Sequence, residues 1–279
     1  MNIKRVAMKI LHISDTHFST KEYQVEPRKI SNGLIELINE KEIGEDFFIV
    51  VTGDITFKGE LKGFTEAGNF FNDLFVGTAI NTKNFIVCPG NHDYDIDKEF
   101  TNFNTFVYGV RKDHQFDFNT SNPNKIYIKE DFCFLSINTA HHLEHTHGKV
   151  DIYNLAVLLE KEKSNIENSK YRIVIFHHNI LNLLDTDNSA IKNSYQLFEL
   201  LKQYNFHFLF HGHQHAKQLF NINGIHVNSI SSLLETRTVS NLVAYYEIKD
   251  KDDFIKEEYT FLKDETNLQG KQGRYRKLC

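Results

Sequence analysis

Short apolar runs alternate with amphipathic stretches along most of the chain. Phe47–Thr52 (FFIVVT) is the clearest run, and the others resemble it in being short and rich in β-branched and aromatic residues, which is typical of buried strands. We predict strands at Lys9–Ser14, Phe47–Thr52, Phe85–Cys88, Phe132–Asn138, Tyr171–Phe176 and Phe206–Phe210.

Three stretches between these strands carry apolar residues at helical spacing, which predicts helices that pack against a sheet. The stripes are Ile30, Leu34, Leu37 and Ile38; Leu155, Leu158 and Leu159; and Leu197, Leu200, Leu201 and Tyr204. Further strand-like runs follow at Lys217–Ile222, Ile225–Ser229, Leu242–Ile248 and Phe254–Phe261. Asn223-Gly224 is a strong signal for a two-residue hairpin. The predicted fold class is layered α/β with mixed sheets and a hairpin-rich C-terminal part.

The composition favours a single domain. The 279 residues include 41% hydrophobic and 25% charged residues, close to the average for a soluble globular protein, and the 14 glycines and 3 prolines indicate no flexible linker. We expect one domain at residues 1–262. Residues 263–279 contain five basic and two acidic residues with little apolar content, and we expect a basic, flexible tail there.

Charge and cysteine usage narrow the functional classes. The net charge of −5 and the pI of about 6.3 disfavour a protein that depends on non-specific attraction to nucleic acid. The three cysteines, Cys88, Cys133 and Cys279, form no disulfide pattern, which suits a reducing cytosol. No signal-peptide core or run of bilayer length is found, so we expect a cytoplasmic protein without a membrane partner.

Five short segments place Asp, Asn or His directly after a predicted strand. They are Asp15-Thr16-His17, Gly53-Asp54, Gly90-Asn91-His92-Asp93, His177-His178 and Gly212-His213-Gln214-His215. In α/β proteins the carboxyl ends of strands are where sites assemble, and the glycines permit turns that aim the next side chain inward. Oxygen and imidazole donors without thiolates suit Mn, Fe, Zn or Ni at hydrolytic sites. The pattern therefore predicts a metal site.

The motif order DxH, GD, GNHD, H and GHxH resembles the calcineurin-like metallophosphoesterase family, from Asp15 to His215. The resemblance implies a four-layer α/β/β/α sandwich with mixed sheets and two divalent metal ions at the sheet edge. It also implies the ligands: Asp15, His17 and His215 for the first ion, Asn91, His177 and His213 for the second, and Asp54 between both. His92 is implied as the residue that meets the substrate without binding metal.

The implied chemistry is phosphoric ester hydrolysis. Two divalent ions clamp the phosphate and share a hydroxide that attacks phosphorus, while His92 protonates the departing oxygen or stabilises its charge. Asp54 sets the spacing, and the neutral Asn91 leaves the pair cationic enough for an anionic substrate. We favour manganese among the candidate metals.

Several neighbouring residues have two interpretations. His178 either contacts substrate or supports a ligand, and Asp93 either orients His92 or caps the following turn. His141, His142, His145 and His147 lie in a loop before the Leu155 stretch. We interpret that loop as solvated, with incidental metal binding, and keep a lid or substrate contact as the alternative.

Departures from the family motifs suggest the substrate class. Protein phosphatases of this family read GDxxDRG and RGNHE, whereas here Phe57 replaces the Asp and Lys58 and Pro89 replace the arginines. Those arginines grip a phosphomonoester dianion, so their loss favours a diester. Residues 53–64 together with GNHD and HH resemble the cyclic-nucleotide phosphodiesterase-like branch, although Asn179 and Ile180 stand where that branch commonly has prolines.

We therefore predict a dinuclear-metal phosphodiesterase acting on a small diester such as a cyclic nucleotide. Neutral surface from Phe18, Tyr94 or the His141–His147 loop would receive the second ester group. The alternatives are a nuclease, or a nucleotide or monoester hydrolase, on the same core, and a non-catalytic protein-binding scaffold. The sequence does not identify protein partners.

Overall fold

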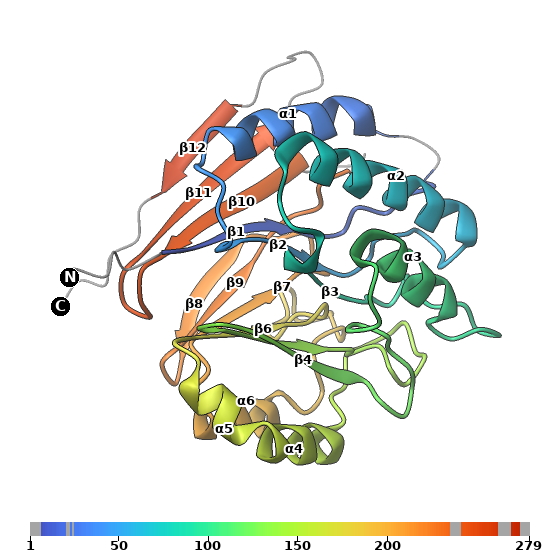
Figure 1. Ribbon diagram of the computed structural model, residues 1–279. Coiled ribbons are helices and arrows are strands. Elements are labelled where there is room, and N and C mark those ends of the chain that lie inside the picture. The colour runs from blue at the N-terminus through green and yellow to red at the C-terminus, as the bar shows by residue number, and fades with distance from the viewer. Residues whose placement is uncertain (1–6, 21–22, 24, 235–240, 262–268, 274–279) are drawn as a thin grey trace, which may run out of the picture.

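Two six-stranded mixed sheets face each other, and helices cover their outer faces (Figure 1). The computed structural model describes residues 7–20, 23, 25–234, 241–261 and 269–273. The four layers confirm the predicted α/β/β/α sandwich.

The first sheet has the order β12-β11-β10-β1-β2-β3. Its strands are β1 (Met8–Ile13), β2 (Phe47–Thr52), β3 (Phe85–Cys88), β10 (Asn241–Ile248), β11 (Phe254–Phe261) and β12 (Gln269–Gly273). Strands β1, β2 and β3 run parallel, and β10 pairs antiparallel with β1. All six residues of β2 are buried, as expected of a β-branched and aromatic strand covered on both faces. Strand β12 lies within the expected tail, and the rest of that segment lies outside the described residues.

The second sheet has the order β4-β5-β6-β7-β9-β8. Its strands are β4 (Asn124–Lys129), β5 (Phe132–Ile137), β6 (Tyr171–Ile175), β7 (Phe208–His211), β8 (Gln218–Ile222) and β9 (Ile225–Ser229). Strands β5, β6, β7 and β9 are parallel, and β8 and β9 form the hairpin that Asn223-Gly224 predicted. Both turn residues have a left-handed backbone, with φ of 53° and 87°.

The helices divide between the two outer layers (Figure 1). They are α1 (Pro27–Asn39), α2 (Leu61–Thr78), α3 (Thr101–Arg111), α4 (Ile152–Lys161), α5 (Lys163–Asn168) and α6 (Ser194–Gln203), with a 3₁₀ turn, η1, at Thr82–Asn84. Helices α1 and α2 lie on the first sheet, and α4, α5 and α6 lie on the second. Each predicted apolar stripe faces its sheet, as Leu34 and Leu155 show by being fully buried. Among the described helices, none has the length and apolar content needed to cross a bilayer.

Aromatic rings fill the space between the sheets, which explains much of the phenylalanine content. Phe48 of β2 packs against Phe134 and Phe132 of β5, with ring centroids 4.7 and 5.0 Å apart. Phe210 of β7 packs against Tyr246 of β10 at 4.9 Å. Large rings in contact bury more area for each ordered side chain than aliphatic residues do, so they hold the two sheets in a fixed relation. The loops at the sheet edge are thereby placed on a rigid support.

Candidate metal centre

The loops that follow β1, β2, β3, β6 and β7 meet at one edge of the sandwich. Backbone hydrogen bonds join them: the Asp15 N–H donates to Gly53 O (3.1 Å), the His17 N–H to Asp54 O (2.9 Å) and the Gly212 N–H to His177 O (3.0 Å). Parallel strands end on the same side of a sheet, so their loops converge there. This convergence brings together residues that are as far as 200 positions apart in sequence.

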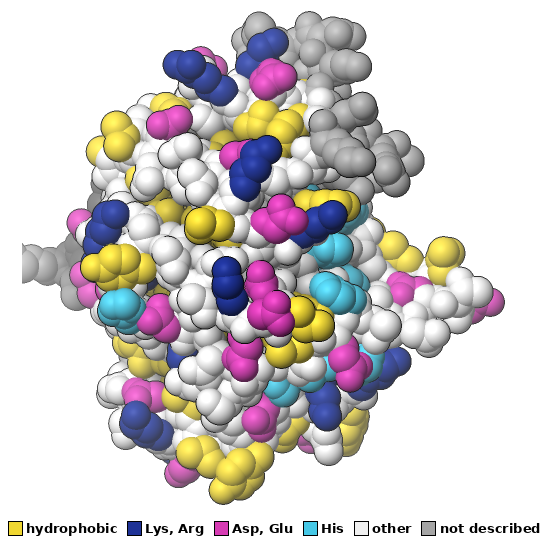
Figure 2. All heavy atoms as spheres, turned by 90° about the vertical axis from the view of Figure 1, so that its right-hand side faces the viewer, with side chains coloured by type: hydrophobic (Ala, Val, Ile, Leu, Met, Phe, Trp, Pro, Cys, Tyr) yellow, Lys and Arg dark blue, Asp and Glu magenta, His cyan; other side chains and the backbone are white. Residues whose placement is uncertain are grey.

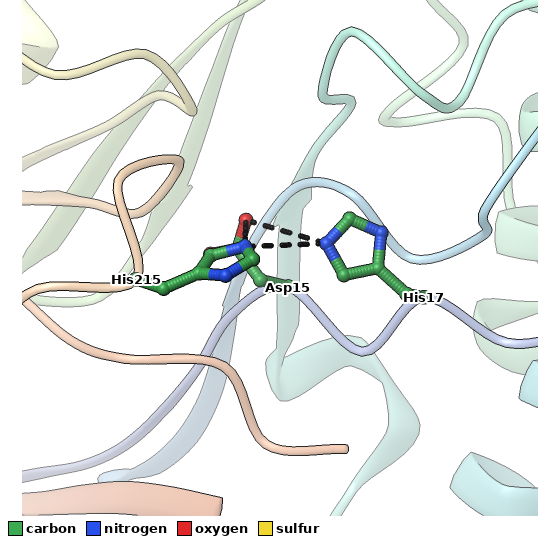
Figure 3. Close-up of side chains that lie close together, drawn as sticks. All are labelled: Asp15, His17 and His215. Atoms are coloured by element: carbon green, nitrogen blue, oxygen red, sulfur yellow. Dashed lines mark hydrogen bonds and ion pairs between the residues drawn. The ribbon is translucent and has the colours of Figure 1, made fainter. Parts of the chain in front are cut away.

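Asp15, His17 and His215 form the first cluster, with their polar atoms pointing toward a common centre (Figure 3). Asp15 Oδ1 lies 3.2 Å from His215 Nε2 and 3.9 Å from His17 Nε2, and the two imidazole nitrogens are 3.3 Å apart. The other carboxylate oxygen of Asp15 is held by the Ser14 hydroxyl at 2.5 Å and the His213 N–H at 3.1 Å. A carboxylate and two facing imidazoles make a donor set that suits a divalent cation.

Asp54, His177 and His213 form the second cluster. His177 Nε2 lies 3.2 Å from Asp54 Oδ2 and 3.0 Å from His213 Nδ1, while Nδ1 of His177 donates to Thr52 O at 2.8 Å. This last bond leaves the lone pair on Nε2, the tautomer that a metal ligand needs. Asn91 is 3% exposed, and its Oδ1 is buried without a hydrogen bond. A buried amide oxygen without a partner is costly, and a cation would satisfy it.

The pKa shifts of Asp54 and of the histidines around it support a cation-binding centre. Burial by itself raises the pKa of the Asp54 carboxyl, but His177, His92 and His17 around it lower that pKa well below its usual range. Burial lowers the pKa of His177, but Asp54, Asp15 and the Thr52 carbonyl together outweigh burial and raise it to about 9. Asp54 also acts on His17 more strongly than Asp15 does. The carboxylate therefore lies within electrostatic reach of both clusters and attracts positive charge.

Five of the seven candidate ligands have a left-handed backbone. These are Asp15, His17, Asp54, His213 and His215, with φ between 44° and 76°. Residues other than glycine rarely adopt this conformation, which costs about 1–3 kcal/mol each and tends to occur at functional sites. The loops are held in this shape by their mutual hydrogen bonds.

Glycines allow the loops to approach closely. Gly53 has φ of +80°, and a Cβ there would lie 2.7 Å from the Gly90 nitrogen and 2.7 Å from His177 Nδ1. At Gly90 and Gly212 the backbone φ is ordinary, and a Cβ would instead collide with Asp54 and with Ser14, respectively. Turns do begin at Gly90 and Gly212, whose carbonyl oxygens accept the Asp93 N–H (3.3 Å) and the Gln214 N–H (3.1 Å), but there glycine is needed for space and at Gly53 also for its backbone conformation.

His92 lies beside both clusters but belongs to neither. Its Nδ1–H donates to Phe57 O at 3.0 Å, and its ring is nearly parallel to the Phe57 ring, at 5.9 Å and 11°. The His17 ring lies 5.4 Å away. Because Nδ1 is occupied, Nε2 is the nitrogen left for a substrate. Nothing in the sequence motif indicated that Phe57 would orient this ring.

Two secondary candidates have supporting positions. His178 is fully buried, its Nδ1 lies 2.8 Å from the Thr139 hydroxyl, and its ring packs 4.7 Å from His213. Its Nε2 is buried without a hydrogen bond, and the contact with the His213 ring fits the supporting role. Asp93 is fully buried as well, and accepts hydrogen bonds from the N–H groups of Ile55 (3.1 Å), Thr56 (2.9 Å) and Gly90 (2.9 Å). These donors all precede Asp93 in the sequence, so its carboxylate ties two loops of the site together and caps no turn that follows it.

Replacing Asp93 with alanine is expected to lower the free energy of unfolding by about 3 kcal/mol or more. The change leaves three buried N–H groups without an acceptor, and each such group costs about 1–3 kcal/mol. Urea denaturation followed by circular dichroism measures the loss. Asp97→Ala, a change at an exposed position, is the control and should stay within about 0.5 kcal/mol of the parent. Equal stability of the two variants would contradict a structural role for Asp93.

Comparison with known proteins identifies the family to which this fold belongs. The family model described as calcineurin-like phosphoesterase matches residues 8–217. No curated protein matches the chain. A dimetal phosphatase from Danio rerio superimposes with a TM-score of 0.63 at 10% identity, covering 95% of this chain and 98% of that one.

Two further solved structures share the architecture. GAP50 of Plasmodium, described as the anchor in the inner membrane complex, has a TM-score of 0.57 at 13% identity, covering 98% of this chain and 90% of its own. A candidate 5'-nucleotidase from Staphylococcus aureus has a TM-score of 0.51 at 14% identity, covering 95% of this chain and 53% of its own. At such identities the similarity establishes the fold alone.

Proposed function

The chain belongs to the calcineurin-like phosphoesterase family, and we propose that within this family it is a dinuclear-metal phosphodiesterase for a small diester. The observation that carries the proposal is the neutral surface beside His92. Phe57 is 42% exposed and stacks on the His92 ring, at the position where the phosphatase motif has an acidic residue. A phosphate held at the two clusters would have this ring as its neighbour.

The proposed ligand roles follow the two clusters. Asp15, His17 and His215 would hold one ion, Asn91, His177 and His213 the other, and Asp54 would contact both. When bound, two divalent ions neutralise the phosphate charge and supply an activated water. The protein holds the donors rigidly, because Ser14, Thr52 and backbone N–H groups fix the atoms that do not face the centre. His92 would protonate the departing oxygen through Nε2. We favour manganese over magnesium, because imidazole ligands favour the softer of these two ions.

Among the residues that the structure describes, no arginine stands at the two motif positions where the phosphatases of this family have one. Pro89 is buried, and Nζ of the exposed Lys58 lies over the Phe57 ring, 6.0 Å from its centroid. Of the described arginines, Arg111 and Arg172 are bonded elsewhere in the fold, to Asp113 and to backbone carbonyls, and Arg28 is exposed on helix α1. A monoester dianion gains most from bidentate arginines, whereas a diester carries one charge that the metal pair can hold.

The second ester group would lie against Phe57. Phe18 and Tyr94, which we expected to offer neutral surface, are 1% and 6% exposed and present little of it. A small pocket of about 120 Å³ adjoins Phe57 on the side of Lys58 and Glu60. Its size suits a compact substituent better than a polymer. We therefore favour a small diester over a nucleic acid.

Bis(p-nitrophenyl) phosphate is expected to be hydrolysed with a higher kcat/KM than p-nitrophenyl phosphate in the presence of Mn²⁺. The comparison is made above pH 7, where the monoester is a dianion. Release of p-nitrophenolate measures both rates. If the monoester is preferred tenfold or more, which is about 1.4 kcal/mol of transition-state preference, the phosphodiesterase proposal is wrong and a phosphatase is indicated.

Phe57→Ser provides a matched test of the surface that carries the proposal. It should reduce kcat/KM for the diester more than for the monoester, because only the diester has a second group to contact this ring.

A nuclease would instead prefer single-stranded nucleic acid to both chromogenic substrates. A protein-binding scaffold would hydrolyse none of them and would hold no metal after purification.

A further inference from the structure

The loop at residues 139–150 separates its four histidines into different environments. His145 turns toward the candidate metal centre: its ring stacks on Tyr94 at 4.8 Å and lies 5.7 Å from the ring of His92. His142 and His147 instead face each other, with ring centroids 5.1 Å apart. Figure 2 shows that histidine side chains gather in a band on this face of the molecule. The loop therefore contains a second group of metal-ligating side chains.

Glu144 completes this group. Its Oε2 lies 3.9 Å from His147 Nδ1, and one donor atom from each of His142, Glu144 and His147 lies within 4.8 Å of the other two. Two ligand atoms bound about 2.1 Å from one zinc ion can be no more than about 4 Å apart, so the group is close to a coordinating arrangement. The Glu144 side chain is 59% exposed, which leaves the remaining coordination positions open to water.

The unpartnered ring nitrogens of His142 are the main evidence for a ligand at this group. Both of its ring nitrogens are shielded from solvent, and neither makes a hydrogen bond of normal geometry, although one lies close to the His147 backbone. Removing a polar atom from water without giving it a partner costs about 1–3 kcal/mol. Such atoms in a folded protein commonly mark a missing water or ion. Here the neighbours that would share an ion with His142 are an imidazole and a carboxylate.

We propose that His142, Glu144 and His147 form a third divalent-cation site, separate from the two clusters of the metal centre. Two imidazoles and one carboxylate are a donor set that zinc accepts, with water in the fourth position. The residues are closely spaced in one loop, so a single ion can join them without moving any strand. The site shares no residue with the metal centre.

An ion at this site would fix the position of His145. Leu143 lies between His142 and Glu144 in the sequence; its backbone oxygen accepts a hydrogen bond from Tyr94 Oη at 2.8 Å, and its φ is 57°. Tyr94 therefore fixes the loop at Leu143, before His145. The ion would fix the loop at His147, after His145. The third ion is a positioning device for the loop next to His92, and its binding does not depend on which ester the protein hydrolyses.

Counting bound zinc tests the proposal. The full-length protein is stripped with a chelator, reloaded with Zn²⁺, passed through gel filtration and measured by elemental analysis. We expect three zinc ions per chain in the parent and two in the double variant His142→Ala, His147→Ala. His114→Ala is the matched control, because His114 also pairs with an acidic residue three positions away, Asp117 at 2.7 Å, and it should retain three.

Glu144→Gln covers the case in which the double variant does not fold, since Glu144 is exposed and its replacement conserves size. Competition with a chromogenic zinc chelator should show the affinity of one site falling about tenfold or more, which is about 1.4 kcal/mol, with the other two unchanged. Equal zinc counts in the parent and the double variant, or unchanged affinities at every site in Glu144→Gln, would each overturn the proposal. The diester preference is measured separately, so failure of either proposal leaves the other standing.

Discussion

Asp54→Ala is expected to yield a folded protein that retains neither ion of the candidate metal centre and has lost about 10³-fold or more in kcat/KM. Asp54 acts electrostatically on both clusters, and on His177 and His17 more strongly than Asp15 does. Without it the second cluster is left with imidazoles and the Asn91 amide, and the first loses a neighbouring negative charge. Metal ions in such sites supply several kcal/mol of transition-state stabilisation, and a 10³-fold loss is about 4 kcal/mol.

Elemental analysis after gel filtration measures the loss of metal, and diester hydrolysis with added Mn²⁺ measures the loss of rate. Asp54→Asn is the matched variant, because its amide oxygen can still accept the His92 N–H that Asp54 Oδ1 accepts at 2.9 Å. It should preserve the loop and its stability while metal affinity still falls. If Asp54→Ala keeps two tightly bound ions at this centre, the role proposed for Asp54 is wrong. Chelation of the parent should abolish activity and Mn²⁺ should restore it.

The strands that are buried on both faces were predictable because their signal is local. Each needs only a run of apolar residues, so β2 and β3 have the predicted bounds. Helix α3 also carried a usable signal, since Phe103, Phe106 and Val107 are buried at helical spacing, but we did not predict it. Helix α2 was harder to recognise: Gly68 and other glycines lower its intrinsic helix propensity, and it forms because its phenylalanines are buried on the sheet.

The convergence of the candidate ligands was predictable for a different reason. Parallel strands place their carboxyl ends together, so residues such as Asp15 and Asp54 must meet whatever lies between them. The details that depend on contacts across the fold were not predictable. Phe57 stacking on His92 and the approach of His145 to His92 result from packing between loops distant in sequence. No spacing rule encodes such contacts.

His92→Ala is expected to retain the metal ions while losing about 10²–10⁴-fold in rate, the usual contribution of a general acid. The His92 side chain lies outside both clusters, and its Nδ1 bond to Phe57 O aims Nε2 outward, so its removal takes away a proton donor and no metal ligand. The size of the loss should depend on the leaving group. p-Nitrophenolate departs without protonation, whereas an alkoxide needs a proton as the bond breaks.

The informative comparison is therefore between an aryl and an alkyl diester in the parent and in His92→Ala, with zinc or manganese content measured on the same samples. We expect the rate with the alkyl diester to fall by a factor several times larger than the rate with the aryl diester, at unchanged metal content. A metal-poor variant would make His92 a ligand, against the geometry described above. Equal losses for both substrates at full metal content would assign His92 to binding the phosphate, because a group that only binds the phosphate cannot distinguish the departing oxygens.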